Sequence, residues 1–174
     1  MIRVVLMGYP GCGKSTVGKQ LAKRLKLEYI SSGDIARSLD TKPGEMCDER
    51  AMRKQLKNAL ANVDELTLHG VREGFVLDGC PRFVDQAIWL NSIVGKYDAV
   101  ILAVTSKEAI SRLTKRNRAD DNMDIIMKRL ADYHKDTYPI MKVIKEGRIA
   151  ACLHVVQAQD KTINNVVDEI VDLL

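Results

Sequence analysis

The chain has 174 residues, 46% of them hydrophobic and 29% charged, which is the composition of an ordinary globular protein. Its formal net charge of +4 gives a mild preference for anionic ligands and is too small to indicate a nucleic-acid-binding protein. No apolar run approaches the ~20 residues of a membrane-spanning helix. The four cysteines are widely spaced, which favours free thiols in a cytoplasmic protein over two disulfides; they are Cys12, Cys47, Cys80 and Cys152.

Apolar runs and helical spacing alternate along the chain. The apolar run at 2–7 leads straight into a glycine-rich loop, so we expect a core strand there and not a signal peptide. Alternating strands and helices predict an α/β protein with a five-stranded parallel sheet covered on both faces. In chain order we predict a strand at 2–7, a helix at 14–27, a strand at 28–30, a polar helical region at 33–63 broken at 42–44, a strand at 75–77, a helix at 83–94, a strand at 99–104, helices at 107–116 and 121–145, the latter bent near Pro139, a strand at 149–156 and a helix at 162–174.

The loop after the first strand fits the Walker A pattern at each fixed position, with Gly-Tyr-Pro-Gly-Cys-Gly-Lys-Ser at residues 8–15. Glycines let several backbone N–H groups converge on a phosphate, and the following helix adds its positive end. Lys14 is placed to reach the β- and γ-phosphates, and the Ser15 hydroxyl suits Mg²⁺. We therefore predict a P-loop three-layer sandwich whose ATP-binding residues include Gly11, Cys12, Gly13, Lys14, Ser15 and Thr16. A helix N-terminus can also make Cys12 reactive, although a small tolerated side chain is the simpler interpretation.

Three further segments make the chain resemble adenylate kinases and their nucleoside monophosphate kinase relatives. The loop resembles the family's Gly-x-Pro-Gly-x-Gly-Lys-Gly-Thr, and residues 31–37 resemble Ser-Thr-Gly-Asp-x-x-Arg. Residues 77–82 resemble Leu-Asp-Gly-Phe-Pro-Arg, with Gln86 four residues on. Arg118-Ala119-Asp120-Asp121-Asn122, with Arg129 beyond it, is similar to the segment that carries the lid arginines. The resemblance implies a single kinase domain over 1–174, with an acceptor-binding insertion at about 31–63 and a short lid at about 116–121.

The resemblance also implies roles for individual residues in phosphoryl transfer, which depends mainly on positioning and positive charge. The catalytic residues would be Lys14, Arg82, Arg116, Arg118 and Arg129. Arg112, which matches the arginine packed on the ATP adenine, would join Arg116 at the ATP site. The AMP-binding residues would be Ser32, Arg37, Met46, Cys47, Gly79, Arg82, Gln86, Arg118 and Arg129.

The carboxylate of Asp78 would hold Mg²⁺ largely through water, together with Ser15; a strand-end cap is the alternative. Asp120 and Asp121 would either orient the lid arginines or begin the next helix. Gln86 would read adenine by donating and accepting at once, unless it is a solvated helix residue. The resemblance thus implies an ATP:AMP phosphotransferase that gives two ADP and uses Mg²⁺. We also expect a monomer, because no long uncommitted apolar surface is evident, and neither nucleic-acid nor membrane partners.

Three departures from the family pattern leave alternatives open. Ser15 stands where typical members have glycine, the segment between Arg37 and Arg82 is short, and only Asn117 separates Arg116 from Arg118. A short lid would exclude water poorly and favour ATP hydrolysis as a side reaction. The alternatives are a kinase for UMP, CMP, a deoxynucleotide or a small metabolite, and a nucleotide-dependent interaction protein with weak ATPase activity.

Overall fold

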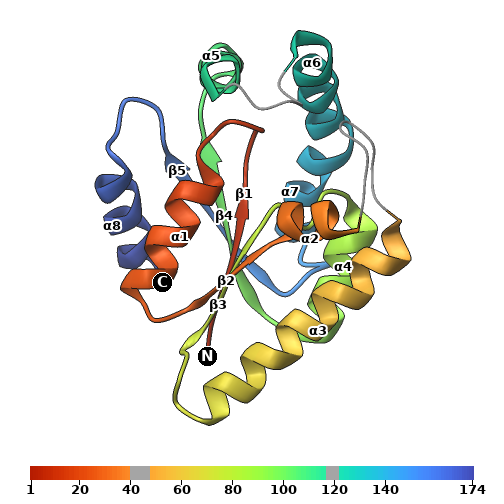
Figure 1. Ribbon diagram of the computed structural model, residues 1–174, viewed down its shortest axis with the longest axis vertical. Helices are drawn as coiled ribbons and strands as arrows, with labels where there is room; N and C mark the ends of the chain where they lie inside the picture. Colours follow the sequence, from red (N-terminus) through yellow and green to blue (C-terminus); the bar gives the residue numbers. More distant parts are fainter. Residues whose placement is uncertain (40–47, 117–121) are drawn as a thin grey trace.

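The computed structural model describes residues 1–39, 48–116 and 122–174. Its strands and helices alternate along the chain, as the sequence predicts (Figure 1). The strands are β1 (Ile2–Met7), β2 (Glu28–Ser31), β3 (Gly74–Asp78), β4 (Tyr97–Ala103) and β5 (Ala151–Gln157). The helices are α1 (Lys14–Arg24), α2 (Ser32–Ser38), α3 (Glu49–Leu68), α4 (Val84–Val94), α5 (Ser106–Arg116), α6 (Met123–Asp132), the π-helical η1 (Tyr133–Thr137), α7 (Tyr138–Lys145) and α8 (Ile163–Leu173).

The five strands form one parallel sheet in the order β2-β3-β1-β4-β5, which confirms the predicted fold class. β1 lies at the centre, because β3 and β4 pair with its two edges. In this register Asp78 at the end of β3 lies between Leu6 of β1 and Ser31 of β2. The phosphate loop, Asp78 and the segment from Ser31 onward therefore start from the same edge of the sheet.

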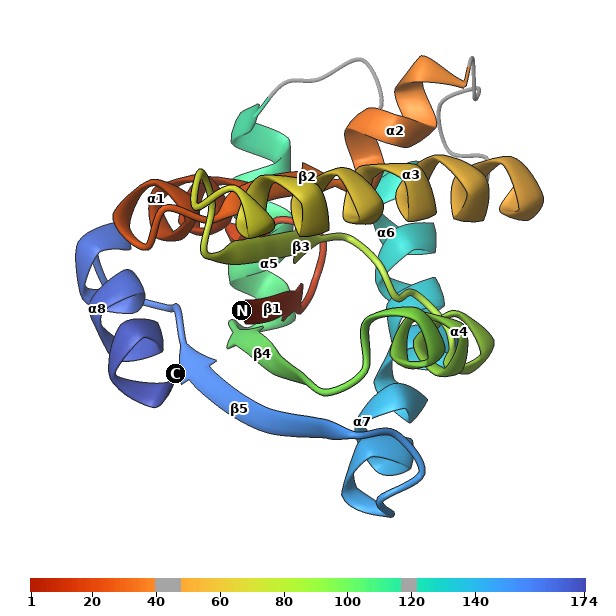
Figure 2. The ribbon, with the colours of Figure 1, turned by 90° about the horizontal axis from the view of Figure 1, so that it is seen from below.

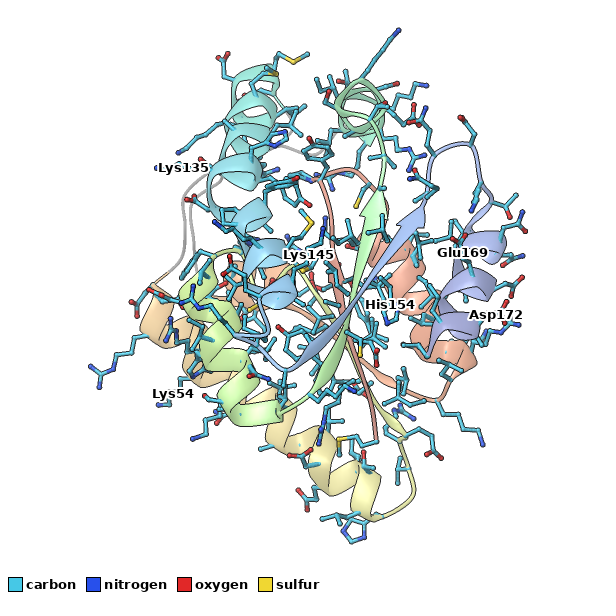
Figure 3. All side chains as sticks on the ribbon, turned by 180° about the vertical axis from the view of Figure 1, so that it is seen from behind. Lys54, Lys135, Lys145, His154, Glu169 and Asp172 are labelled. Atoms are coloured by element: carbon cyan, nitrogen blue, oxygen red, sulfur yellow. The ribbon has the colours of Figure 1, made fainter. Side chains whose placement is uncertain are left out.

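Two apolar layers cover the two faces of the sheet. Alternate residues of β1 divide between them: Val4 and Leu6 pack with α1, α5, α6 and α8, whereas Val5 and Met7 pack with α3, α4 and α7. Such strands lack a polar face because both of their faces are buried. Figure 2 shows α1 and α8 on one side of the sheet and α4 and α7 on the other. Charged side chains such as Lys54 and Lys135 are exposed at the surface (Figure 3).

The structure corrects several predicted boundaries. α3 runs to Leu68, five residues beyond the predicted end at 63, and the turn that follows it contains Gly70, whose φ is 67°. β4 begins at Tyr97 and not at residue 99, while β5 begins at Ala151 and not at residue 149. Within the described residues, no helix is both long enough and apolar enough to cross a membrane.

The helix expected at 121–145 contains a π-helical turn where a bend was predicted. α6 runs into η1, and α7 then begins with Pro139 in its first turn. Proline has no N–H to donate, and its ring clashes with the carbonyl four residues earlier, so regular α-helical bonding cannot continue through it. The i→i+5 bonding of η1 avoids that conflict without breaking the helix.

Candidate functional site

The phosphate loop curls between the end of β1 and the start of α1. Gly11 has a φ of 84°, and a Cβ added there would lie 2.7 Å from the carbonyl oxygen of Ala109. Gly13 caps α1 with a φ of 101°, a left-handed conformation that glycine adopts without strain. The Lys14 ammonium donates hydrogen bonds to the carbonyl oxygens of Gly8 and Tyr9, both at 2.8 Å. The loop thus holds a cation at the amino end of a helix, which suits a phosphate.

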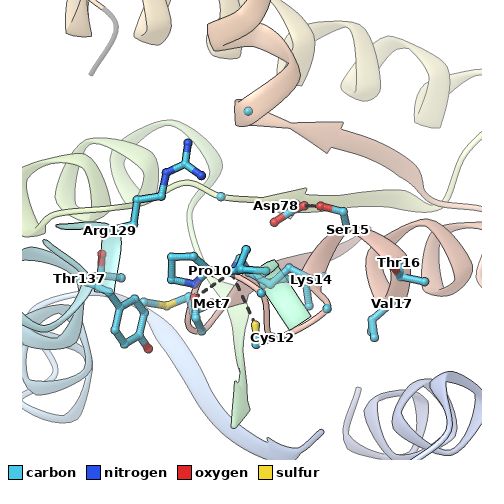
Figure 4. Close-up of a pocket in the computed structure, with 18 of the residues that line it drawn as sticks. Met7, Pro10, Cys12, Lys14, Ser15, Thr16, Val17, Asp78, Arg129 and Thr137 are labelled. Carbon is cyan, nitrogen blue, oxygen red and sulfur yellow. Dashed lines mark hydrogen bonds between the residues drawn. The ribbon is translucent and has the colours of Figure 1, made fainter. Parts of the chain in front are cut away.

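The Asp78 carboxylate faces the phosphate loop and is 5% exposed. Its Oδ2 accepts a hydrogen bond from the Ser15 hydroxyl at 2.6 Å (Figure 4). It accepts a second from the Tyr29 hydroxyl at 2.8 Å. Burial, together with the negative charge of Asp78, raises the pKa of Tyr29 well above its ordinary value, so Tyr29 remains a donor. A buried carboxylate beside a hydroxyl supplies the oxygen ligands that Mg²⁺ prefers, and these residues therefore fit that ion.

The segment after β2 lies directly against the segment after β3. Ser32 is 2% exposed, and its hydroxyl has no hydrogen-bond partner among the described residues. A Cβ added to Gly79, whose φ is 84°, would lie 2.6 Å from that hydroxyl oxygen. Glycine at position 79 therefore permits the close approach of the two predicted acceptor motifs.

Two predicted acceptor arginines lie on these segments. Arg37 forms an exposed ion pair with Asp34 one turn earlier in α2, and this hydrogen bond lowers the pKa of the Asp34 carboxyl. Arg82 donates from Nε to the carbonyl oxygen of Gly79 at 3.1 Å. Its own carbonyl oxygen accepts a hydrogen bond of 2.7 Å from the hydroxyl of Thr137 in η1.

Gln86 is buried at 4% exposure, so it is not a solvated helix residue. Its Oε1 accepts from the backbone N–H of Arg82 at 2.7 Å, and its Nε2 donates to Glu49 Oε2 at 2.8 Å. The nitrogen retains a second proton, and the second lone pair of the oxygen meets only a weak donor, the Cys80 thiol at 3.7 Å.

Arg112 links the phosphate loop to the residue that follows β5. Its guanidinium donates to Glu108 Oε1 at 2.7 Å, to the carbonyl oxygen of Cys12 at 3.3 Å and to that of Ala158 at 3.2 Å. Cys12 itself is buried at 1% exposure, with its sulfur 3.6 Å from the Lys14 ammonium nitrogen. This burial favours the interpretation of Cys12 as a small structural side chain.

One pocket of about 900 Å³ joins these groups. The predicted ATP-binding residues, the predicted acceptor-binding segments and residues of α6 and η1 all line it. Arg129 extends into the pocket from the side opposite Ser15 and Asp78 (Figure 4). Of the predicted site residues, the structure brings together in this lining Gly11, Cys12, Gly13, Lys14, Ser15, Thr16, Arg37, Asp78, Gly79, Arg82, Arg112, Arg116 and Arg129. Ser32 and Gln86 lie just behind it, in contact with Gly79 and the Arg82 backbone.

Some predicted residues lie outside the described part of the chain, namely Met46, Cys47, Asn117, Arg118, Asp120 and Asp121. Sequence reasoning missed four other residues: Tyr29, Glu49, His134 and Thr137. Tyr29 gave one weak signal, since an aromatic hydroxyl two residues before Ser31 lies on the same strand face. The others act through contacts with distant segments; His134, for example, hydrogen-bonds the Tyr9 hydroxyl of the phosphate loop.

The comparisons with known proteins agree with one another. Residues 6–149 match the family model described as adenylate kinase. The adenylate kinase of Mycobacterium sp. (strain MCS) is 36% identical over 153 residues, covering 80% of this chain and 84% of that protein. The adenylate kinase of Thermobifida fusca is 37% identical over 157 residues, covering 80% and 82%. That of Mycolicibacterium smegmatis is 34% identical over 158 residues, covering 83% and 87%.

Proposed function

Because this chain belongs to the adenylate kinase family, we propose that it transfers the γ-phosphoryl group of ATP to AMP, giving two molecules of ADP. One observation carries the proposal. A single pocket is lined by the phosphate loop with Lys14 and, on another wall, by the acceptor-motif residues Arg37, Gly79 and Arg82. Two phosphate-binding walls in one pocket suit a reaction that holds two nucleotides in line.

In this reaction Lys14 would lie along the β- and γ-phosphates of ATP, and Arg112 would lie beside its adenine. Arg37 and Arg82 would hold the acceptor phosphate, because paired guanidinium donors fit phosphate oxygens. Arg116, Arg118 and Arg129 would surround the transferred group and stabilise the charge that develops on it.

Mg²⁺ would be held by the Ser15 hydroxyl and, largely through water, by Asp78. When bound, the ion neutralises phosphate charge and orients the phosphate oxygens. Tyr29 helps to hold Asp78 Oδ2 in place through its 2.8 Å hydrogen bond. This arrangement leaves Asp78 Oδ1 without a bond to either hydroxyl.

On the acceptor side, Ser32 and Gln86 would contact the base of AMP, together with Met46 and Cys47. The buried Ser32 hydroxyl, without a partner among the described residues, supports a polar ligand there. The described cysteines, Cys12, Cys80 and Cys152, are free thiols, which supports a reducing compartment such as the cytoplasm. We further propose that the protein acts as a monomer.

The direct test is to measure ADP formed from ATP and Mg²⁺ with AMP, UMP, CMP or dAMP as acceptor. We expect AMP to give the highest kcat/KM, and Lys14→Ala to abolish the reaction with every acceptor. Full activity with UMP or CMP and none with AMP would retain the kinase class and overturn AMP as acceptor. Turnover unaffected by Lys14→Ala would overturn the assignment of the phosphate loop.

A further inference from the structure

The side-chain amide of Gln86 is held by partners of opposite chemical character. Its Oε1 accepts from the backbone N–H of Arg82 at 2.7 Å and from the Cys80 thiol at 3.7 Å. Its Nε2 donates to the Glu49 carboxylate at 2.8 Å. A backbone N–H can only donate, and an ionised carboxylate can only accept. The orientation of the amide is therefore defined by its partners.

A reversed amide would be unfavourable at both ends. It would place the NH₂ group against the Arg82 N–H and the oxygen against the Glu49 carboxylate. Both contacts would leave buried polar groups unpaired, because the whole Gln86 residue is only 4% exposed. Gln86 thus has one remaining N–H and one lone pair that only the weak contact with the Cys80 thiol occupies, in a fixed order in space.

Glu49 is itself fixed at the start of α3. Its Oε1 accepts from Arg53 Nε at 2.6 Å, and the Arg53 guanidinium lies 5.4 Å from the centre of the Trp89 ring. The preceding residue, Asp48, caps the helix by accepting from the backbone N–H of Ala51 at 3.0 Å. The carboxylate that faces Gln86 is therefore anchored to α3 and, through Trp89, to α4.

A fixed amide order distinguishes two classes of purine. Adenine carries a 6-amino group that donates, whereas a 6-oxo purine carries an oxygen that accepts at the same position. A glutamine that is free to flip can pair with either class from one base position. A glutamine with a fixed amide pairs with one class and leaves unmatched polar groups with the other.

We propose that Glu49 is a positioning residue that fixes the Gln86 amide and thereby makes the acceptor site select a 6-amino purine over a 6-oxo purine. The inference rests on the proposed function, because it requires the Gln86 amide to meet the acceptor base. It adds to that function a residue outside the acceptor motifs and a second, negative element of specificity.

The test compares AMP with IMP, whose base is the 6-oxo counterpart of adenine, in the wild type and in Glu49→Gln. The variant keeps the size of the side chain, but its own amide can offer either an N–H or a carbonyl to Gln86. We expect the ratio of kcat/KM for AMP to that for IMP to fall about 10-fold, with the KM for ATP unchanged. Part of the change should be a gain with IMP, which structural damage would not produce.

Glu146→Gln is the matched control, because Glu146 also pairs with a cation one turn away, Lys142, but lies at the C-terminal cap of α7 and has no amide partner among the described residues. It should leave the ratio unchanged.

An unchanged ratio in Glu49→Gln, or an equal loss with both acceptors, would overturn the proposal. If Glu49→Gln fails to fold, Arg53→Gln, which frees the other carboxylate oxygen, should give a smaller fall; no fall would overturn the proposal.

Measurements on the wild type distinguish failure of the proposed function from failure of the positioning role of Glu49. Phosphorylation of AMP by the wild type tests the proposed function alone, before any variant is made. If the wild type uses AMP but its ratio does not respond to Glu49, only the positioning role fails. If the wild type does not use AMP, the positioning role fails together with the proposed function.

Discussion

The hydroxyl of Thr137 lies 2.7 Å from the carbonyl oxygen of Arg82 and donates a hydrogen bond to it across 55 residues of sequence. This bond connects the π-helical turn to the loop that carries a predicted acceptor arginine. Thr137→Val keeps the shape of the side chain and removes the donor. We expect kcat/KM for AMP to fall roughly 2–10-fold, the usual value of one neutral hydrogen bond. Thr137→Ser, which keeps the hydroxyl, should restore it; equal losses in both variants would contradict this role.

Lys14→Ala should reduce phosphoryl transfer by several orders of magnitude, because the ammonium would contact charge that develops in the transition state. The fold should persist, since among the residues that the structure describes Lys14 bonds only within its own loop. Circular dichroism and thermal unfolding check the fold, and single-turnover kinetics check the chemical step. A folded variant with near-native turnover would be incompatible with the proposed role of Lys14.

Gln86→Ala should raise the KM for AMP much more than the KM for ATP. The change removes the hydrogen bonds to Arg82 and Glu49 and strands the Glu49 oxygen, so we expect at least a several-fold effect on the acceptor. Steady-state kinetics with each substrate varied in turn give both constants. Equal increases in the two KM values would place Gln86 outside the acceptor site.

Ser15→Ala and Tyr29→Phe should both raise the Mg²⁺ concentration needed for half-maximal activity. Each variant removes one of the two hydroxyl donors on Asp78 Oδ2, and Ser15→Ala also removes a metal ligand. We expect the larger shift, about 10-fold, for Ser15→Ala. Mg²⁺ titrations at fixed ATP, with calorimetric binding of ATP in the presence and absence of Mg²⁺, measure the effect. A Mg²⁺ requirement unchanged in both variants would exclude the assigned metal position.

Tyr97→Phe should stabilise the protein. The Tyr97 hydroxyl is buried without a hydrogen-bond partner among the described residues, a situation that costs roughly 1–3 kcal/mol. Burial, with a smaller contribution from Cys80, raises the pKa of Tyr97 from 10.0 to about 12. Chemical denaturation at pH 7 should therefore give a free energy of unfolding about 1 kcal/mol higher for the variant.

The same residue predicts a difference between wild type and variant at alkaline pH. Between pH 10 and about 12 the native state keeps the Tyr97 proton that the unfolded state has lost, so the free energy of unfolding decreases as pH rises. Two pKa units correspond to about 2–3 kcal/mol. Tyr97→Phe should lack this part of the decrease. Parallel curves for the two proteins would show that Tyr97 does not titrate abnormally.

The sequence predicted what depends on local pattern. All five strands lie near their predicted positions, and the three central ones, β1, β3 and β4, follow apolar runs because a strand buried on both faces needs such a run. The phosphate loop and Asp78 could be found because their chemistry requires fixed residue types at fixed spacing. Tyr29 and Glu49 could not, because their partners lie 49 and 37 residues away and depend on which elements become neighbours.

The π-helical turn also left no recognisable pattern in the sequence, because i→i+5 and i→i+4 bonding use the same residue types. Pro139 predicted a bend near this point, and the structure shows a π-helical turn just before it. The start of β5 was misplaced because burial continues outside the strand: Ile149 is 2% exposed although it precedes β5.

The π-helical turn changes the directions in which residues before and after it project from one long helix. Eight residues separate Arg129 from Thr137, and in an α-helix of 3.6 residues per turn this distance overshoots two turns by about 80°. The looser winding of η1 turns the chain less per residue and so reduces that overshoot. Both side chains line the same pocket. Deleting one residue from η1 would favour regular α-helical bonding and rotate everything before it relative to everything after it. One helix would then no longer present Arg129 and the Thr137 hydroxyl to the same cavity.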